Sequence, residues 1–251
     1  TDMNIKWEIS ESDIQKITDF VNQHKNPFVE NRIERNIYRR NINIDKDSVL
    51  RCMLMCLLTT QQRSGPDSLI SVFLRQNPFP LTYTIISHVE DVEDYVRWVL
   101  QNNSLNRYIN KIPAFFAINL SYLEDTKWLL LLNIESLLED RVTKQTERIV
   151  ADSIDQSFKG FGSKQARNFL QALGLTKYEI PIDSRITNWL NDFGFPVTLS
   201  ATALQEKAYY HFVSDGIQLL CERANIYPCV LDAAIFSSFD NGQWTKENAI
   251  Y

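Results

Sequence analysis

Glycine is scarce in this sequence, with only seven glycines among 251 residues. Tight β-hairpin turns depend on glycine, so a strand-rich fold would have few places to reverse direction. Apolar residues instead recur at helical spacing, and Val92, Tyr95, Val96 and Val99 share one helical face. The run 49–58 is almost continuously apolar and lacks a strand-like content of β-branched residues, which favours a buried helix. We therefore predict a mainly α fold.

The first 45 residues follow a different pattern. Alternating, β-branched and aromatic positions occur there, including Ile37, Ile42 and Ile44, and such positions are typical of strands. We predict a small strand-bearing subdomain over 1–45, followed by a helical domain over 46–251.

Composition excludes several classes of protein. No apolar run approaches the roughly 18 residues needed to cross a bilayer, and residues 1–10 do not have the pattern of a signal peptide. We therefore expect no membrane partner. The four cysteines lack the spacing to one another and to histidine that zinc or iron–sulfur sites require, so we expect buried thiols, no metal and no cofactor. They are Cys52, Cys56, Cys221 and Cys229.

Positive charge is concentrated locally, although the net charge is −5. Residues 31–40 hold four arginines against one glutamate, and 141–168 hold six basic residues against three acidic ones. Local charge, more than the total, decides where a polyanion can dock. These segments could equally be solvated helix faces, and the motifs that they contain decide between the two interpretations.

The most informative motif is a glycine-rich turn between two predicted helices. A helix over 143–158 leads into residues 159–164, where Gly160 and Gly162 flank one phenylalanine. Such a turn can bring backbone amides close to an external group. Ser163 could cap the next helix, which Gly174 would end. The first turn of that helix would offer free N–H groups to a phosphate.

A second motif follows the second helix of this turn. Asp183 comes after Pro181 and two positions before Arg185, at the start of another helical pattern. An aspartate in this position is typical of a helix N-cap, which is one interpretation of Asp183.

The two motifs together resemble the helix-hairpin-helix–Gly/Pro-Asp superfamily of DNA glycosylases, since Lys164 ends the hairpin and Asp183 follows it by nineteen residues. The resemblance implies a two-lobed helical bundle in which Lys164 attacks the sugar and Asp183 is the essential carboxylate. A lysine at this position indicates a bifunctional glycosylase and AP lyase. The chain lacks the clustered C-terminal cysteines of the endonuclease III branch, which favours the 8-oxoguanine DNA glycosylase branch.

Two further stretches resemble the same branch. Gln61 or Gln62, after the predicted helix 49–58, would fill the space left by an extruded base, although a surface glutamine is the alternative. Phe236 would stack on the flipped base, and Asp232, one helical turn earlier, would read its pairing edge. Phe236 could instead be a core residue, and Asp232 could form an ion pair or cap a helix.

The resemblance implies damaged double-stranded DNA as the partner of a monomeric enzyme, in the bacterial or archaeal cytoplasm with the nucleoid or in a eukaryotic nucleus. The expected DNA contacts are Gln61, Gln62, Lys159, Gly160, Gly162, Ser163, Arg167 and Arg185. Arg185 stands where the family commonly has histidine, so the role of that histidine does not transfer.

The residues leave three other functions open. In a monofunctional alkylbase glycosylase, Lys164 would only bind phosphate. A non-catalytic helix-hairpin-helix DNA-binding protein would need neither Lys164 nor Asp183 for chemistry, and a plain helical interaction module would not bind DNA at all. Within the preferred mechanism, Asp183 could accept the proton of Lys164 or stabilise positive charge on the sugar.

Overall fold

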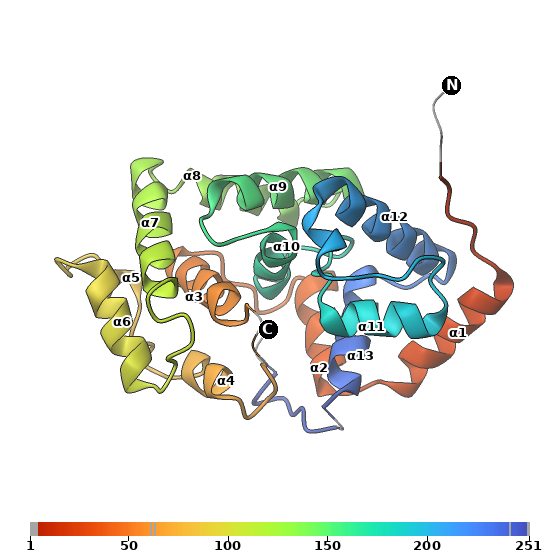
Figure 1. Cartoon of the computed structure of the whole chain (residues 1–251), viewed down its shortest axis with the longest axis horizontal. Helices are drawn as coiled ribbons and strands as arrows, with labels where there is room; N and C mark the ends of the chain where they lie inside the picture. The colour runs from red at the N-terminus through yellow and green to blue at the C-terminus, as the bar shows by residue number, and fades with distance from the viewer. Residues whose placement is uncertain (1–4, 61, 63, 241, 250–251) are drawn as a thin grey trace.

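The computed structural model describes residues 5–60, 62, 64–240 and 242–249, and within them every regular element is a helix (Figure 1). The mainly α prediction is confirmed. The helices form two lobes, each around its own cluster of buried apolar side chains.

The prediction of strands near the N-terminus is wrong. Residues 5–45 contain α1 (Glu11–Gln23), α2 (Pro27–Arg32) and a short π-helix (Ile33–Ile37) that continues α2. The reason lies in capping and burial, because Ser10 caps α1 with its side chain, and Ile17 and Val21 are buried four residues apart on one face of that helix.

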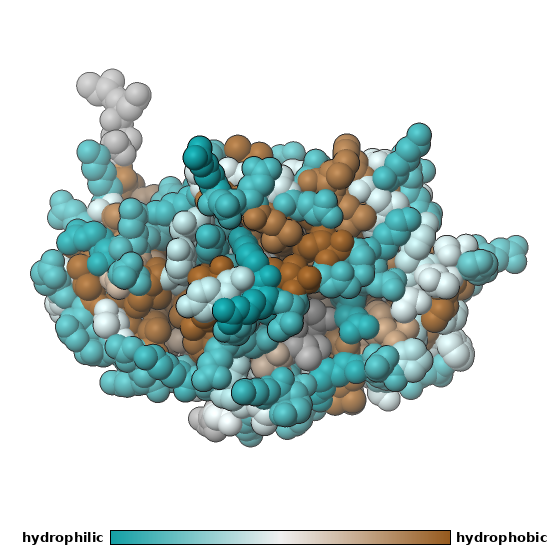
Figure 2. Space-filling view, turned by 180° about the vertical axis from the view of Figure 1, so that it is seen from behind, coloured by the Kyte–Doolittle hydropathy of each residue, from teal (hydrophilic) through white to brown (hydrophobic). Residues whose placement is uncertain are grey.

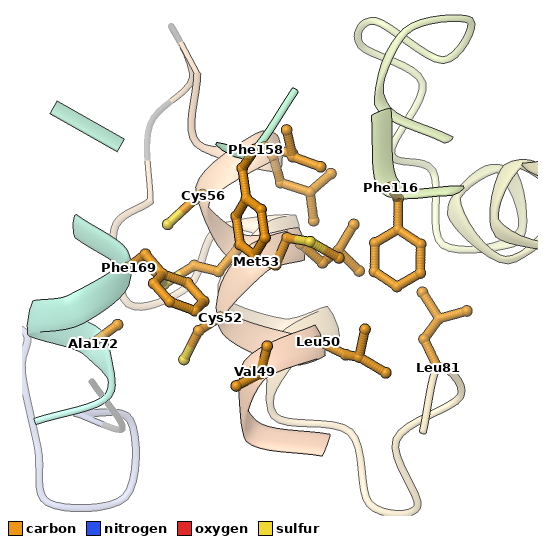
Figure 3. Packing of buried hydrophobic residues seen from close by; sticks show 14 of the residues in the cluster. Val49, Leu50, Cys52, Met53, Cys56, Leu81, Phe116, Phe158, Phe169 and Ala172 are labelled. Carbon is orange, nitrogen blue, oxygen red and sulfur yellow. The ribbon is translucent and has the colours of Figure 1, made fainter. Parts of the chain in front are cut away.

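The first lobe comprises eight consecutive α-helices, α3 to α10. Its central helix is α3 (Lys46–Leu58), the buried helix that the sequence predicts. Phe158, Phe169 and Ala172 pack against one side of α3, and Leu81 and Phe116 lie on its other side (Figure 3). The remaining helices are α4 (Leu69–Leu74), α5 (Tyr83–Ile86), α6 (Val92–Asn102), α7 (Ile112–Asp125), α8 (Leu129–Glu135), α9 (Lys144–Ser157) and α10 (Ser163–Ala172), with a 3₁₀ turn at Ser136–Leu138.

The second lobe joins both ends of the chain. Helices α1 and α2 pack with α11 (Ser184–Phe193), α12 (Lys207–Arg223) and α13 (Pro228–Ser238), and a 3₁₀ turn covers Ala203–Gln205. The segment before α1 is held by Trp7, whose ring lies directly over Gly216 of α12. A Cβ atom at Gly216 would come within 2.6 Å of that ring, so the close approach requires glycine.

The surface is mixed in character. Seen from behind, hydrophobic side chains gather over parts of the molecule between hydrophilic ones (Figure 2). Among the described residues, none of the helices combines the length and the hydropathy that crossing a membrane requires.

Candidate active site

The turn between α9 and α10 is a compact hairpin in which the two glycines have different reasons to be glycine. Gly160 has a φ of +82°, and a Cβ atom there would lie 2.5 Å from the ring of Phe115 and 2.9 Å from Leu57. Gly162 has extended backbone, with no atom within 4 Å of its Cβ position. Gly160 therefore serves the packing of the hairpin, whereas Gly162 leaves the backbone open to an external group.

The first residues of α10 differ in one respect from the prediction. Gly162, not Ser163, is the N-cap of α10, and no side chain caps this end. Ser163 is nearly buried, and its hydroxyl donates a hydrogen bond of 3.1 Å to Asp155 of α9. The uncapped amides of the first turn therefore remain available to a ligand.

The hairpin is fixed to α7 by one buried amide side chain. Asn119 accepts a hydrogen bond of 2.7 Å from the Lys159 backbone N–H and donates one of 3.0 Å to the Lys159 carbonyl. The side chain of Lys159 is left exposed at the surface. Asn119 is a residue that the sequence analysis missed, because its partner lies forty positions away.

A cavity of about 690 Å³ opens between the two lobes and contains most of the predicted site residues. Lys164 enters it from α10 and Asp183 from the start of α11, so the structure brings these two side chains to one cavity. Gln62 also lines it, while Gln61 lies outside the described residues. Both Lys164 and Asp183 are partly exposed.

Asp183 combines the two interpretations that the sequence leaves open. Its Oδ1 accepts hydrogen bonds from the backbone N–H groups of Arg185 (2.9 Å) and Ile186 (3.1 Å), so it is the N-cap of α11. Its Oδ2 has no hydrogen-bond partner in the described part of the chain. One oxygen thus fixes the carboxylate, and the other remains available to the cavity.

The wall of the cavity contains a buried ion pair. Asp232 is 4% exposed, and its Oδ2 accepts hydrogen bonds from Arg32 Nη1 (2.7 Å) and Gln171 Nε2 (2.8 Å). Burial raises the pKa of Asp232 above its usual value, and the Arg32 charge partly offsets this. Arg32 Nε and Gln171 Oε1 are buried without partners among the described residues. The ion-pair interpretation of Asp232 is therefore correct, and the pair lies in the cavity wall.

An aromatic cluster forms the adjoining wall. Phe236 stacks with Phe28 at 5.1 Å between ring centroids, and Trp244 packs against both rings. The Arg185 guanidinium lies 3.9 Å from the centroid of Phe236 and donates to the Phe236 carbonyl. Arg185 is therefore held by α13 and also lines the cavity, and its contact with phosphate stays a prediction. Phe236 is only partly buried and borders the cavity.

The expected contact between Arg167 and DNA is wrong. Arg167 is 0% exposed, and its guanidinium is paired with Glu179 (2.7 Å) and Asp152 (2.9 Å) inside the protein. A helical pattern places Arg167 one turn after Lys164, but it cannot show that this side chain turns away from the cavity.

All four cysteines are free and buried, as expected. Among the described residues, no group of histidine, cysteine and acidic side chains is arranged to hold a metal ion.

Solved structures share this arrangement of helices. The 8-oxoguanine DNA glycosylase of Thermotoga maritima has a TM-score of 0.64 and 16% sequence identity, over 91% of this chain and 96% of that one. An 8-oxoguanine glycosylase/lyase from Methanocaldococcus jannaschii, in complex with DNA containing 8-oxoguanine, has a TM-score of 0.68 and 15% identity, over 92% and 99% of the two chains. The chain has the fold of the 8-oxoguanine DNA glycosylases.

The similarity to known proteins lies in the fold. No family model matches the sequence, and no curated protein matches it significantly. The TM-scores show a shared fold, and because only about one residue in six is identical, the chemistry has to be argued from the residues of the site.

Proposed function

We propose that the protein is a bifunctional DNA glycosylase and AP lyase that removes an oxidised purine, with 8-oxoguanine as the preferred base. The observation that carries the proposal is the placement of Lys164 and Asp183 in one cavity beside the hairpin. A lysine nucleophile with a nearby carboxylate is the pair that Schiff-base chemistry on a sugar requires.

The duplex would be held by the hairpin. The uncapped N-terminus of α10 favours a phosphate, and the open backbone at Gly162 lets one approach closely. Exposed Lys159 adds positive charge on the same turn. The target base must leave the stack to reach the cavity, which costs a few kcal/mol, and Gln62 at the cavity rim is suited to fill the space left behind.

In the reaction, the neutral amine of Lys164 attacks C1′ of the sugar, and the base leaves with the electrons of the glycosidic bond. The C1′–O4′ bond then breaks to give a Schiff base on Lys164, and loss of a proton from C2′ expels the 3′ phosphate and nicks the strand. The free Oδ2 of Asp183 accepts the proton that Lys164 loses or stabilises the positive charge that develops on the sugar. These steps use only side chains of this protein.

The wall of the cavity is suited to a guanine-like edge. Arg32 and Gln171 donate to the Oδ2 atom of Asp232, which leaves its Oδ1 atom to accept hydrogen bonds from a bound base. Guanine-type bases present an acceptor, O6, beside two donors, N1–H and N2–H₂. Leaving such buried polar groups unpaired costs about 1–3 kcal/mol each, so a base with a different edge would bind less well. The exposed edge of the Phe28–Phe236 cluster would contact the base ring.

The test is covalent trapping. Wild-type protein incubated with a duplex containing 8-oxoguanine and borohydride should become linked to the DNA, and Lys164→Gln should not, while still folding and binding the duplex. Excision without trapping by the wild-type protein would instead favour the monofunctional alternative. A parallel panel with thymine glycol, 3-methyladenine analogues and uracil would contradict the base assignment if 8-oxoguanine were not among the best substrates.

A further inference from the structure

The segment that presents Asp183 has no regular secondary structure. Helix α10 ends at Ala172 and α11 begins at Ser184, and the intervening chain pairs with other segments mainly through side chains. The position of Asp183 relative to Lys164 therefore depends on whatever holds residues 175–183. Four buried polar side chains from outside this segment contact its backbone, namely Asn36, Glu147, Tyr210 and Gln218.

Tyr210 of α12 holds the residues directly before Asp183. Its hydroxyl donates to the Ile180 carbonyl at 2.8 Å and accepts from the Ile182 N–H at 2.9 Å. The side chain is 1% exposed, so water does not replace these bonds in the folded protein. One hydroxyl thereby fixes the backbone on both sides of Pro181.

Arg167 connects this anchor to the helix that carries Lys164. It lies one turn after Lys164 on α10, and its guanidinium lies 5.0 Å from the centre of the Tyr210 ring. The same guanidinium pairs with Glu179, four residues before Asp183, at 2.7 Å. Arg167 therefore contacts two of the groups that hold the segment, the Tyr210 ring and the Glu179 carboxylate.

Glu179 is held from three helices at once. Besides Arg167 of α10, its carboxylate accepts hydrogen bonds from Arg148 of α9 and Gln218 of α12, each at 2.9 Å. The carboxylate is 0% exposed. Removing one member of a buried ion-pair network leaves uncompensated charge, so such a network has few alternative arrangements.

We propose that Arg167, Glu179 and Tyr210 are positioning residues that set the approach of the Asp183 carboxylate to Lys164. This inference rests on the proposed function, because it assumes that these two groups act together. Arg167 and Glu179 do not line the cavity. Tyr210 does line it, but its side chain is 1% exposed and its hydroxyl is bonded to the backbone at Ile180 and Ile182. The effect of the three residues passes through the backbone at 179–183 and through α10.

The first experiment uses Tyr210→Phe, which keeps the ring and removes the bridging hydroxyl. We expect the single-turnover excision rate on an 8-oxoguanine duplex to fall about 10- to 100-fold, since displacements near 1 Å can cost that much. Affinity for the duplex should stay at the wild-type value, because the hairpin is untouched. Trapping on abasic-site DNA should fall less than excision does.

The matched control is Tyr95→Phe. Tyr95 also donates its hydroxyl to a backbone carbonyl, that of Pro80 at 3.2 Å, but it lies in the first lobe away from the cavity. The Tyr95→Phe substitution should leave the excision rate unchanged. Glu179→Gln should lower excision as Tyr210→Phe does, and its melting temperature shows how much of its loss comes from unfolding.

Hydrogen exchange gives a readout that does not depend on activity. In Tyr210→Phe, the amides of 178–183 should exchange faster than in the wild-type protein, with the rest of the chain unchanged. Wild-type excision by Tyr210→Phe, equal losses of rate and affinity, or unaltered exchange in this segment would each overturn the positioning role. A wild-type protein that excises no base would instead contradict the proposed function, and the exchange data would still decide whether the segment is held as described.

Discussion

The two lobes differ in how the chain builds them. The buried residues of the first lobe come from one continuous stretch, 49–175, whereas those of the second come from 17–29 and 180–249. Lys164 belongs to the first lobe, and Asp183 is the N-cap of α11 in the second. The cavity is therefore shared between a lobe assembled from neighbouring helices and one that forms only when the two ends of the chain meet.

Because the lobes are built differently, the parts of the site depend on different regions of the chain. The hairpin and Lys164 are set by helices of the first lobe, with α9, α10 and α3 packed together. The ion pair in the cavity wall, by contrast, is formed by Arg32, near the start of the chain, and Asp232, near its end. The proposed nucleophile and the proposed phosphate-binding turn should therefore tolerate changes in the second lobe, while the proposed base pocket should not.

The largest effect should come from the carboxylate at the boundary between the lobes. Asp183→Asn should lower the rate of base excision by about 10²- to 10⁴-fold, since it removes charge and proton acceptance in the reaction. The amide oxygen can still accept the cap bonds, so stability and DNA affinity should change little. Single-turnover kinetics with a binding titration would check this, and a wild-type rate in the variant would leave Asp183 only its capping role.

The second lobe should depend on its buried ion pair. Arg32→Met should lower the free energy of unfolding by about 3–5 kcal/mol, because it leaves the Asp232 carboxylate buried without its cation. The control is Arg40→Met, which breaks the exposed pair with Glu34 and should cost about 0–1 kcal/mol. Chemical denaturation of both variants would test the contrast, and equal losses would show that the pair does not support the lobe.

The junction of the lobes should respond to pH through Glu147. This carboxylate is 0% exposed and accepts hydrogen bonds from the backbone N–H groups of Lys177, Tyr178 and Glu179. Burial nevertheless raises its pKa from 4.5 to about 7. The folded protein then holds a proton that the unfolded chain has lost. This contribution to stability is complete below pH 4.5 and disappears as pH rises to about 7, a change of about 3 kcal/mol at most.

The measurement is the free energy of unfolding of the wild-type protein minus that of Glu147→Gln, at a series of pH values. Glutamine does not titrate, so this difference should fall between pH 4.5 and 7. A difference that rises over the same interval would mean that the three N–H donors outweigh burial and keep Glu147 ionised.

The smallest effects should come from the two glycines of the hairpin, and they should differ between the two positions. Gly160→Ala should cost about 2 kcal/mol of stability, because it combines a left-handed backbone with a clash against Phe115. Gly162→Ala should leave stability unchanged and weaken DNA binding, since its Cβ would stand in open space where a phosphate is expected. Thermal melts and binding titrations would check both, and a reversed order of the two would contradict the assigned roles.

Local patterns determined a large part of this protein. The helical character of the described residues after 45, the turn at 159–164 and the end of α10 just before Gly174 follow from spacing, capping and glycine placement, which are properties of neighbouring residues. The prediction of strands up to residue 45 was wrong because β-branched residues also pack well on a helix face once other helices cover it.

The sequence by itself placed Lys164 and Asp183 in defined local positions, at the start of one helix and at the cap of another. Only the tertiary structure brought Arg32 and Gln171 to Asp232, turned Arg167 inward to Glu179, and held Arg185 on Phe236. The physical reason is that helix periodicity gives the face of a side chain within its own helix, whereas the partner on that face is supplied by a segment far away in the chain.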